Sequence, residues 1–307
     1  MAQSAISSSK EMHIFLLKNR SASGRRPAEA LSRKMSHFQR TIWRYYRVHG
    51  RHTLPWRPPT LRLRRGKTNE FVYKILVSEV MLQQTQVERV IPFYAEFTKR
   101  FPTAKKLAAA PLSEVLKTWQ GLGYNRRAKM LHDAAKKLLV RKIYSVGELE
   151  ALPGVGPYTA RAVAAFAYNQ DVVFVETNIH TAITHHFFAN KKKVSDKEIE
   201  EVLVQILPRG RAREWYSALM DYGAYLKKSG IKLNAKQAKY TKQKKFAGSL
   251  REARGAILHA LASGSRTQTY LINLFGPSRR TQMREAQKAL QSEGLIKRKK
   301  NHFKLAD

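Results

Sequence analysis

Apolar residues recur at helical spacing along most of this chain, which predicts a mainly α-helical fold. Between residues 35 and 49 the apolar positions are typical of an amphipathic helix, and they are Phe38, Ile42, Tyr45 and Tyr46. Residues 70–87 carry more apolar side chains and predict a mostly buried helix. The same spacing and the helix start signals predict further helices over residues 91–101, 104–109, 114–119, from 125 onwards, 157–168, 178–188, 195–207 and 215–226.

One stretch, residues 151–178, combines a tight glycine turn with a helix and a carboxylate. Gly154 and Gly156 permit positive φ and leave backbone N–H groups uncovered where Pro157 opens the helix. Such a helix start attracts phosphate. The predicted phosphate-binding residues are Pro153, Gly154, Val155 and Gly156. A plain pair of helices with a glycine corner is the alternative.

A single acid, Glu79, lies inside the apolar helix predicted over residues 70–87. Its neighbours Val77, Val80 and Leu82 indicate burial, which raises the pKa of a carboxyl by disfavouring its charged form. A carboxyl that stays protonated near neutral pH can donate a proton in catalysis. The alternative places Glu79 on the exposed face of the helix.

A second glycine corner, Gly121 to Tyr124, precedes a basic helix that begins near Arg126 and Arg127. A tyrosine on such a corner suits stacking on bases, and arginines suit phosphate. The alternative is a helix turn with a packing tyrosine. Three histidines, His180, His185 and His186, lack the spacing of a metal site, so they predict packing or phosphate contact instead.

Three strings connect these features to a known family: SEVMLQQTQ at 78–86, LPGVG at 152–156 and LPWR at 54–57. Together they resemble the helix-hairpin-helix DNA glycosylase superfamily, and within it the MutY type of adenine glycosylase. The resemblance implies a two-lobed, all-helical glycosylase domain that flips a base out of duplex DNA.

The resemblance also implies site residues. Glu79 is expected to protonate the adenine leaving group, Glu176 to stabilise the sugar cation, Asn178 to orient them and Tyr158 to line the site. The residues expected to contact DNA are Gln83, Gln84 as a wedge, Thr85, Gly121, Tyr124, Arg126, Arg127 and the turn 153–156. Those expected to line the base pocket are Leu54, Trp56, Arg57 and Leu82.

The chain departs from the family pattern at three places. Glu176 stands where the family has aspartate, and Asp171, at the start of a predicted strand, is the nearest alternative acid. Tyr158 occupies the position of the lysine that forms a Schiff base in the lyases of the endonuclease III type, so a monofunctional glycosylase is expected. The chain contains no cysteine, which excludes the cysteine-held iron–sulfur cluster of most relatives, and we expect no cofactor or metal.

Charge then narrows the choice of partner. The chain has 307 residues and a formal net charge of +36, so a polyanion is expected, and double-stranded DNA with mismatched or damaged bases fits best. An anionic membrane is the rival partner, but no apolar run of about eighteen residues is present. Zero cysteines favour a cytoplasmic, nucleoid-associated location, and a monomer is expected.

Three domains are predicted. Residues 1–34 read as a flexible basic arm, as an over-extended start before Met35 or as an organelle presequence. Residues 35–247 are the predicted glycosylase domain, with its helix-hairpin-helix at 151–160. Residues 248–307 predict helices over 254–261, 268–275 and 278–292 and a hairpin of 295–298 with 302–305, which resembles a small winged helix that binds DNA or protein.

Three functions stay open on the sequence. The first is an adenine glycosylase acting opposite guanine or 8-oxoguanine, which SEVMLQQTQ favours. The second is a thymine glycosylase acting on G·T mismatches, whose relatives also tend to carry a tyrosine after the glycine turn. The third is a DNA-binding protein that has kept the scaffold and lost turnover, for which the altered residue Glu176 speaks.

Overall fold

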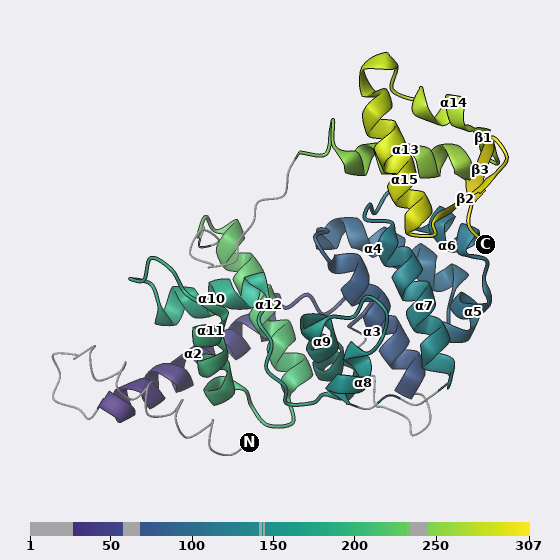
Figure 1. The fold of residues 1–307 in the computed structure, drawn as a ribbon. Helices are drawn as coiled ribbons and strands as arrows, with labels where there is room; N and C mark the ends of the chain where they lie inside the picture. Colours follow the sequence, from purple (N-terminus) through teal and green to yellow (C-terminus); the bar gives the residue numbers. More distant parts are fainter. Residues whose placement is uncertain (1–26, 58–67, 141–142, 144, 232, 234–244) are drawn as a thin grey trace. The chain divides into compact units, whose positions relative to one another are not determined.

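The computed structural model describes residues 27–57, 68–140, 143, 145–231, 233 and 245–307 (Figure 1). The described part is mainly helical, which confirms the predicted fold class. Its first helices are α2 (Pro27–His49), α3 (Thr68–Leu82), α4 (Val87–Arg100), α5 (Ala104–Ala109), α6 (Leu112–Thr118) and α7 (Arg126–Val140). They are followed by α8 (Val146–Glu150), α9 (Pro157–Tyr168), α10 (Thr177–Phe187), α11 (Asp196–Ile206) and α12 (Ala212–Lys228).

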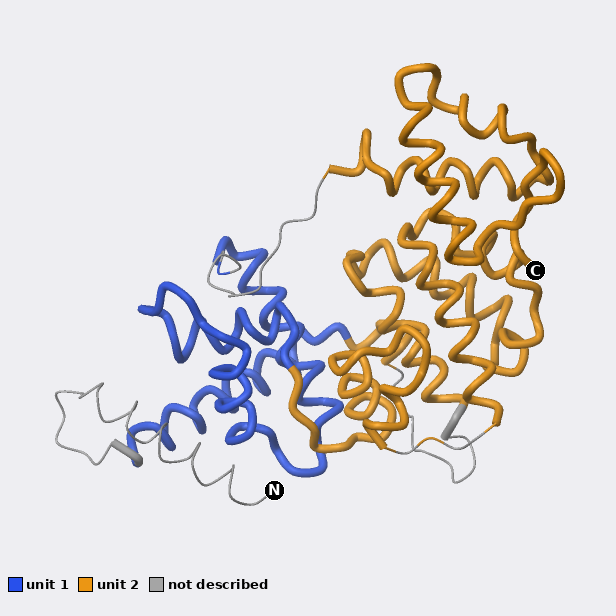
Figure 2. The backbone as a smooth tube through the Cα atoms, in the orientation of Figure 1, with its two compact units in different colours: residues 1–51, 175–240 blue, residues 52–174, 241–307 orange. Residues whose placement is uncertain are grey.

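The chain divides into two compact units (Figure 2). Unit 1 comprises residues 1–51 and 175–240, and unit 2 comprises residues 52–174 and 241–307. The chain therefore leaves unit 1 after its first helix and returns to it at residue 175. Two units of this kind agree with the two-lobed organisation expected of the helical domain. The predicted domain boundary at residues 247 and 248 falls inside unit 2 and stays a prediction.

Unit 1 is built on α12, which packs against α10 and α2. Aromatic rings fill its core, where Phe38 of α2 meets Trp215 of α12 edge to face at 6.3 Å between centroids. Asp221 of α12 is buried, and its carboxylate accepts hydrogen bonds from the backbone N–H of Arg51 at 2.8 Å and from the Arg51 Nε at 2.6 Å. The ion pair ties the end of the first segment to the returning helix.

Unit 2 is organised around α3, which packs against α4, α7 and α9. The helix is buried along almost its whole length because nearly every position from 71 to 81 is apolar. Tyr73 is fully buried, and its hydroxyl donates a hydrogen bond to the carbonyl of Phe101 at 2.6 Å. The burial of residues 75–81 places the polar residues Ser78 and Glu79 in the interior of unit 2.

The structure corrects the predicted start of the first helix, the predicted end of the helix over residues 70–87 and a predicted strand. The first helix begins at Pro27 rather than Met35, because proline is favoured at a helix start and Glu29 complements the helix dipole there. The predicted arm thus shrinks to residues 1–26, which lie outside the described residues. The helix expected over residues 70–87 ends at Leu82, since Gln84 takes a φ of 56° and interrupts it. Residues 171–175 form no strand, because the strands in the described part of the chain all pair with one another in the C-terminal sheet.

The C-terminal part of unit 2 contains α13 (Leu250–Ala262), β1 (Arg266–Thr267), α14 (Gln268–Ile272), a short 3-10 turn η2 (Pro277–Arg279), α15 (Arg280–Ser292), β2 (Ile296–Lys299) and β3 (His302–Leu305). The strands form one antiparallel sheet in the order β1-β3-β2, with Arg298 opposite Phe303. The three helices and the hairpin agree with the prediction. Strand β1 was missed because a strand of two residues is too short to show an alternating pattern in the sequence. The winged-helix assignment stays a prediction.

Candidate active site

Glu79 lies on α3 inside unit 2, with 7% of its surface exposed. Glu79 is therefore buried, as its apolar neighbours predict, and does not lie on an exposed face of the helix. The hydroxyl of Tyr158, on α9, donates a long hydrogen bond of 3.5 Å to the Glu79 Oε2. Tyr158 is held in place by Phe174, whose ring it meets edge to face at 5.7 Å. A carboxyl so enclosed is suited to carrying a proton into a water-poor site.

The residues after α3 form a tight turn rather than more helix. Gln84 is exposed and adopts a left-handed backbone conformation with φ of 56°. On one side of it, the Gln83 side chain donates to the Thr159 hydroxyl of α9 at 3.4 Å. On the other, the backbone N–H of Thr85 donates to the Leu82 carbonyl at 3.2 Å. The predicted wedge residue therefore stands at the tip of a turn that is fixed on both sides.

A second tight turn carries Tyr124, the residue expected to stack on bases. Gly121, Gly123 and Tyr124 all have positive φ, of 95°, 72° and 48°. The Trp119 indole N–H donates to the Gly123 carbonyl at 3.1 Å, which anchors the turn to the buried end of α6. The Tyr124 hydroxyl accepts a 2.9 Å hydrogen bond from Arg251 of α13. Arg251 was not predicted, because nothing in the sequence connects it to a tyrosine so distant along the chain.

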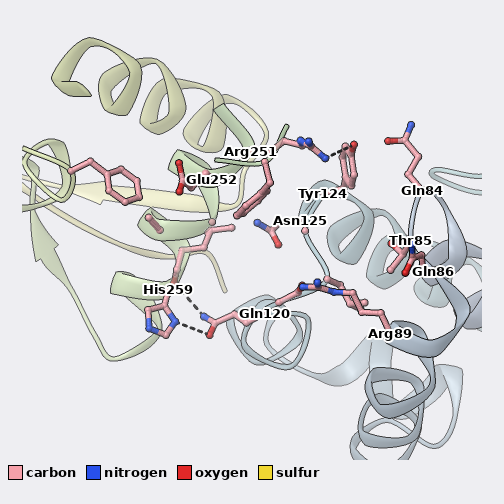
Figure 3. A pocket seen from close by; sticks show the side chains of 18 residues that line it. Gln84, Thr85, Gln86, Arg89, Gln120, Tyr124, Asn125, Arg251, Glu252 and His259 are labelled. Atoms are coloured by element: carbon pink, nitrogen blue, oxygen red, sulfur yellow. Dashed lines mark hydrogen bonds between the residues drawn. The ribbon is translucent and has the colours of Figure 1, made fainter. Parts of the chain in front are cut away.

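The two turns line one pocket of about 840 Å³ together with residues of the C-terminal segment (Figure 3). Gln84 and Tyr124 line it from the two turns, and Arg251 of α13 lies next to Tyr124 in the view of Figure 3. Phe246 also lines the pocket. The exposed His259 ring, which also lines the pocket, meets the Gln120 side-chain oxygen at 3.4 Å (Figure 3). Aromatic rings, amides and an arginine are the groups that contact exposed nucleobases.

Arg127 was predicted to contact DNA phosphate, and the structure contradicts this. Only 8% of its surface is exposed, and its guanidinium donates to backbone carbonyls inside unit 2. Burial lowers the pKa of Arg127 to about 10. Its neighbour Arg126 is exposed, so the phosphate prediction stands for that residue. Consecutive helix positions point in different directions, which explains the contrast.

The glycine turn before α9 has the expected form with two corrections. Gly154 has φ of 75° and a Cβ there would lie 2.7 Å from the Met130 Cβ, so glycine is required. Gly156 caps α9 with φ of −88°, so its glycine is not needed for a positive φ. Val155 is buried, and its N–H donates to the Leu152 carbonyl at 3.1 Å, so this amide is not bare. No side chain caps α9 at Gly156, which leaves an exposed helix start beside Pro153 for an anion.

The residues expected around the base are partly packed into the core. Leu54 and Trp56 are each 8% exposed, and the Trp56 ring meets the Tyr94 ring edge to face at 5.3 Å. Arg57 and Leu82 are partly exposed, and the Arg57 N–H donates to the Leu54 carbonyl at 2.8 Å. The role of these four residues in a base pocket stays a prediction.

Glu176 belongs to unit 1 and forms the N-cap of α10. Its Oε2 accepts the backbone N–H of Asn178 at 2.7 Å, and its Oε1 accepts the Asn178 side-chain amide at 3.2 Å and the Thr177 hydroxyl at 2.5 Å. Asn178 is therefore in contact with Glu176, and its predicted role of orienting both carboxyls stays a prediction. The positive end of the helix dipole and three donors stabilise a negative charge at this position.

Gly223 of α12 supports the same helix start and was missed in the sequence. A Cβ at this position would lie 2.0 Å from the Asn178 carbonyl oxygen, so α12 and the first turn of α10 touch through their backbones. One turn later, burial lowers the pKa of Lys227, and the charge of Glu176 partly opposes the shift. A glycine inside a long helix is the only signal of this contact that the sequence offers.

Two histidines of α10, His180 and His186, are held by hydrogen bonds within unit 1. The His180 ring lies between the Val194 carbonyl at 3.2 Å and the Thr184 hydroxyl at 3.1 Å, and His186 meets the Tyr222 hydroxyl at 2.9 Å. Burial lowers the pKa of His186 to about 4, so the ring is neutral near pH 7. In the described ranges, no group of three or more His, Asp or Glu residues is arranged to hold a metal ion. No helix in these ranges is both long and apolar enough to cross a bilayer.

The structure thus groups the candidate residues in two sets. Glu79, Tyr158 and the three turns belong to unit 2, whereas Glu176 and Asn178 belong to unit 1. That the two carboxyls converge on one nucleoside stays a prediction.

The chain is similar to several known proteins. The chain is 40% identical over 183 residues to the adenine DNA glycosylase of Mycolicibacterium smegmatis, covering 57% of this chain and 59% of that protein. It is 36% identical over 195 residues to the adenine DNA glycosylase of Buchnera aphidicola subsp. Baizongia pistaciae, covering 62% and 52%. The chain therefore matches little more than half the length of these relatives.

Among solved structures, a thermostable thymine-DNA glycosylase aligns with a TM-score of 0.52 and 25% identity, covering 64% of this chain and 88% of that one. An iron–sulfur cluster does not fit this sequence, because it contains no cysteine to supply a thiolate. Residues 77–209 match the family model described as HhH-GPD superfamily base excision DNA repair protein, and they include Glu79, Tyr158 and Glu176. Over these residues, the chain is similar to the HhH-GPD superfamily of base excision DNA repair proteins.

Proposed function

We propose that this protein is a DNA N-glycosylase that removes adenine from mismatches with guanine or 8-oxoguanine. The observation that carries the proposal is the burial of Glu79 in α3, with the Tyr158 hydroxyl directed at its carboxyl group. An enclosed carboxyl at this position, within the string SEVMLQQTQ, is what protonation of an adenine leaving group requires.

The second carboxylate completes the chemistry. Cleavage of an N-glycosidic bond passes through a cation-like sugar, so a donor of one proton and a stable negative charge are both useful. Glu176 accepts three hydrogen bonds at the start of α10, an environment for an ionised carboxylate. In the proposed mechanism Glu79 protonates the base, and Glu176 stabilises the positive charge on the sugar until water attacks.

The replacement of aspartate by Glu176 is compatible with this role. The longer side chain folds back onto the backbone N–H of Asn178 and still caps the helix. Asp171, the alternative acid, is exposed and lies outside any regular element. Tyr158 offers no amine, so we propose a monofunctional glycosylase that needs no cofactor.

Double-stranded DNA with a mismatched or damaged base pair is the proposed partner. The high positive charge favours binding to phosphate, and the exposed start of α9 offers a place for one. We propose that the protein acts as a monomer in the cytoplasm, in association with the nucleoid.

A thymine glycosylase acting on G·T mismatches is the second candidate. The similarity to a solved thymine-DNA glycosylase, at 25% identity, favours it, whereas the higher identity to adenine glycosylases speaks against it.

The test is cleavage of defined duplexes. The full chain is incubated with duplexes that contain A·8-oxoguanine, A·G or T·G, and alkali-labile sites are measured. We expect strand breaks at adenine in the first two duplexes. Breaks at thymine alone would select the second candidate, and binding without breaks would show a DNA-binding protein that has lost turnover.

Variants then assign the carboxyls. Glu79→Gln and Glu176→Gln are each expected to lower the single-turnover rate by about 10²- to 10⁴-fold without loss of DNA binding. Glu150→Gln is the matched control, since Glu150 is an exposed residue at the end of α8. Loss of cleavage in Asp171→Asn, with cleavage retained in Glu176→Gln, would transfer the second role to Asp171.

A further inference from the structure

Arg127 is buried in unit 2, and its five hydrogen bonds all go to backbone carbonyls. Its Nη1 donates to Val80 at 2.8 Å, Met81 at 3.2 Å and Gln83 at 2.7 Å. Its Nη2 donates to Leu122 at 3.3 Å and Gly123 at 3.2 Å. One planar group therefore joins the C-terminal end of α3 to the glycine turn of residues 121–124.

Two of these carbonyls have special positions. Those of Gln83 and Gly123 directly precede Gln84 and Tyr124, whose φ angles are 56° and 48°. In the described residues only four non-glycine residues have positive φ, and two of them follow a carbonyl that Arg127 holds. A left-handed conformation is unfavourable for such residues and persists only where the surroundings enforce it. Arg127 supplies that enforcement at both turns.

The burial of Arg127 is itself unfavourable. The guanidinium has no carboxylate partner among its hydrogen bonds, and its Nε is buried with no hydrogen-bond partner. A charged group with an unsatisfied donor contributes little net stability. The arginine is therefore better explained by the two turns that it holds in place than by a gain in stability.

Tyr124 is contacted by Arg127 through its ring as well. The Arg127 guanidinium carbon lies 5.2 Å from the centre of the Tyr124 ring, and 5.6 Å from that of Trp119. Gln84 and Tyr124 line the same pocket, and their side chains extend from their turns toward the same edge of it in the view of Figure 3.

We propose that Arg127 is a positioning residue that sets Gln84 and Tyr124 as a pair for entry into the base stack beside the extruded nucleotide. The inference rests on the proposed function and deepens it, because it assigns the two inserting side chains to a common support. Lysine cannot replace arginine in this role, since a single ammonium lacks the planar fork that reaches two sets of carbonyls.

The test uses Arg127→Lys in the full chain and a duplex with adenine opposite 8-oxoguanine and 2-aminopurine next to the adenine. Binding is measured by fluorescence anisotropy and unstacking by the fluorescence of 2-aminopurine. We expect the variant to bind with nearly unchanged affinity, to lose the rise in fluorescence and to cleave on the order of a hundredfold more slowly in single turnover. A wild-type rise in fluorescence in the variant would overturn the proposal.

Two further variants separate position from charge and from stability. If Arg127 instead contacts phosphate, Arg127→Met should reduce the slope of log binding constant against log salt concentration by about 1. The proposal predicts an unchanged slope. Leu138→Ala in the same helix removes a buried side chain far along α7 from both turns, and should lower the melting temperature without loss of unstacking. Equal loss of unstacking in Leu138→Ala would reduce Arg127 to a structural residue.

A further experiment combines Arg127→Lys with the loss of both inserting side chains. In a Gln84→Ala, Tyr124→Ala background, Arg127→Lys should cause little further loss of rate, because its effect passes through those side chains. Full additivity would overturn the proposal. The fluorescence measurement does not need turnover, so a wild-type protein that unstacks DNA without cleaving it contradicts the proposed function alone. A wild-type protein that binds without any rise in fluorescence contradicts the role of the two inserting residues.

Discussion

The two candidate carboxyls differ in almost every physical respect. Glu79 lies near the C-terminal end of a buried helix of unit 2, and the Tyr158 hydroxyl donates a long hydrogen bond of 3.5 Å to its carboxyl group. Glu176 stands at the start of a helix of unit 1 and accepts hydrogen bonds of 2.5, 2.7 and 3.2 Å from the two residues that follow it. The contrast teaches that the place of a glutamate on a helix decides its surroundings: packed helices enclose Glu79, whereas donors of its own helix start hold Glu176.

The contrast also shows how much support each carboxyl needs. Glu79 depends on long-range packing of α3 against α4, α7 and α9. Glu176 depends on local hydrogen bonds and on the close approach of Gly223 to the Asn178 carbonyl. Variants that disturb one kind of support should therefore leave the other carboxyl intact.

Among the variants that disturb the support of a carboxyl, Gly223→Ala is expected to have the largest effect. Its Cβ would lie 2.0 Å from the Asn178 carbonyl oxygen, so α12 and the start of α10 must move apart. We expect a loss of about 1–3 kcal/mol in unfolding free energy. A displacement of Glu176 by about 1 Å should lower the single-turnover rate on the order of a hundredfold. Chemical denaturation and cleavage of the A·8-oxoguanine duplex measure these effects.

Gly147→Ala is the control for that variant. Gly147 lies in α8 with no atom within 4 Å of an added Cβ, so alanine should be neutral or stabilising by roughly 0.5–1 kcal/mol. A wild-type rate in Gly223→Ala would show that the start of α10 tolerates movement and that Gly223 supports the fold alone.

A smaller effect is expected when the cap itself is changed. Glu176→Ala should lower the free energy of unfolding by about 1 kcal/mol, because α10 loses its N-cap, whereas Glu176→Asp should keep the cap. Ser195→Ala removes the N-cap of α11 in the same unit and should have a similar cost without slowing cleavage. An Ala variant as stable as the wild-type protein would show that Glu176 does not cap the helix in solution.

The smallest effect is expected from Tyr158→Phe. The substitution keeps the ring that packs against Phe174 and removes a hydroxyl whose hydrogen bond to Glu79 is long. We expect the single-turnover rate to fall by less than about tenfold and the melting temperature to stay unchanged. A loss as large as that of Glu79→Gln would mean that the hydroxyl takes part in proton transfer and that Glu79 does not act alone.

Much of the fold could be read from local pattern. Helix α5 has the predicted bounds, and Ser195 and Glu198 form the predicted capping box with hydrogen bonds between side chains and backbone. These features depend on residues within one or two turns of each other, so a single sequence contains the information. The resemblance carried by SEVMLQQTQ then pointed to Glu79 and to the turn that follows it.

Arg126 and Arg127 show what local sequence pattern could not predict. Adjacent in the chain and identical in chemistry, they were assigned the same contact with phosphate, yet one is exposed and the other is buried among carbonyls of two turns. The roles of Gly223 and Arg251 could not be predicted either. Gly223 is needed because a carbonyl of another helix lies against it, and Arg251 has its hydrogen-bond partner, Tyr124, far away along the chain.

The sequence by itself determined the helical class, most helix positions, the high positive charge, the lack of cysteine and the two acids. The tertiary structure alone decided which of two neighbouring arginines points inward, where α3 stops and which glycine lets two helices touch. The physical reason is that periodicity and capping involve near neighbours, whereas burial and backbone contact depend on residues brought together only when the chain has folded.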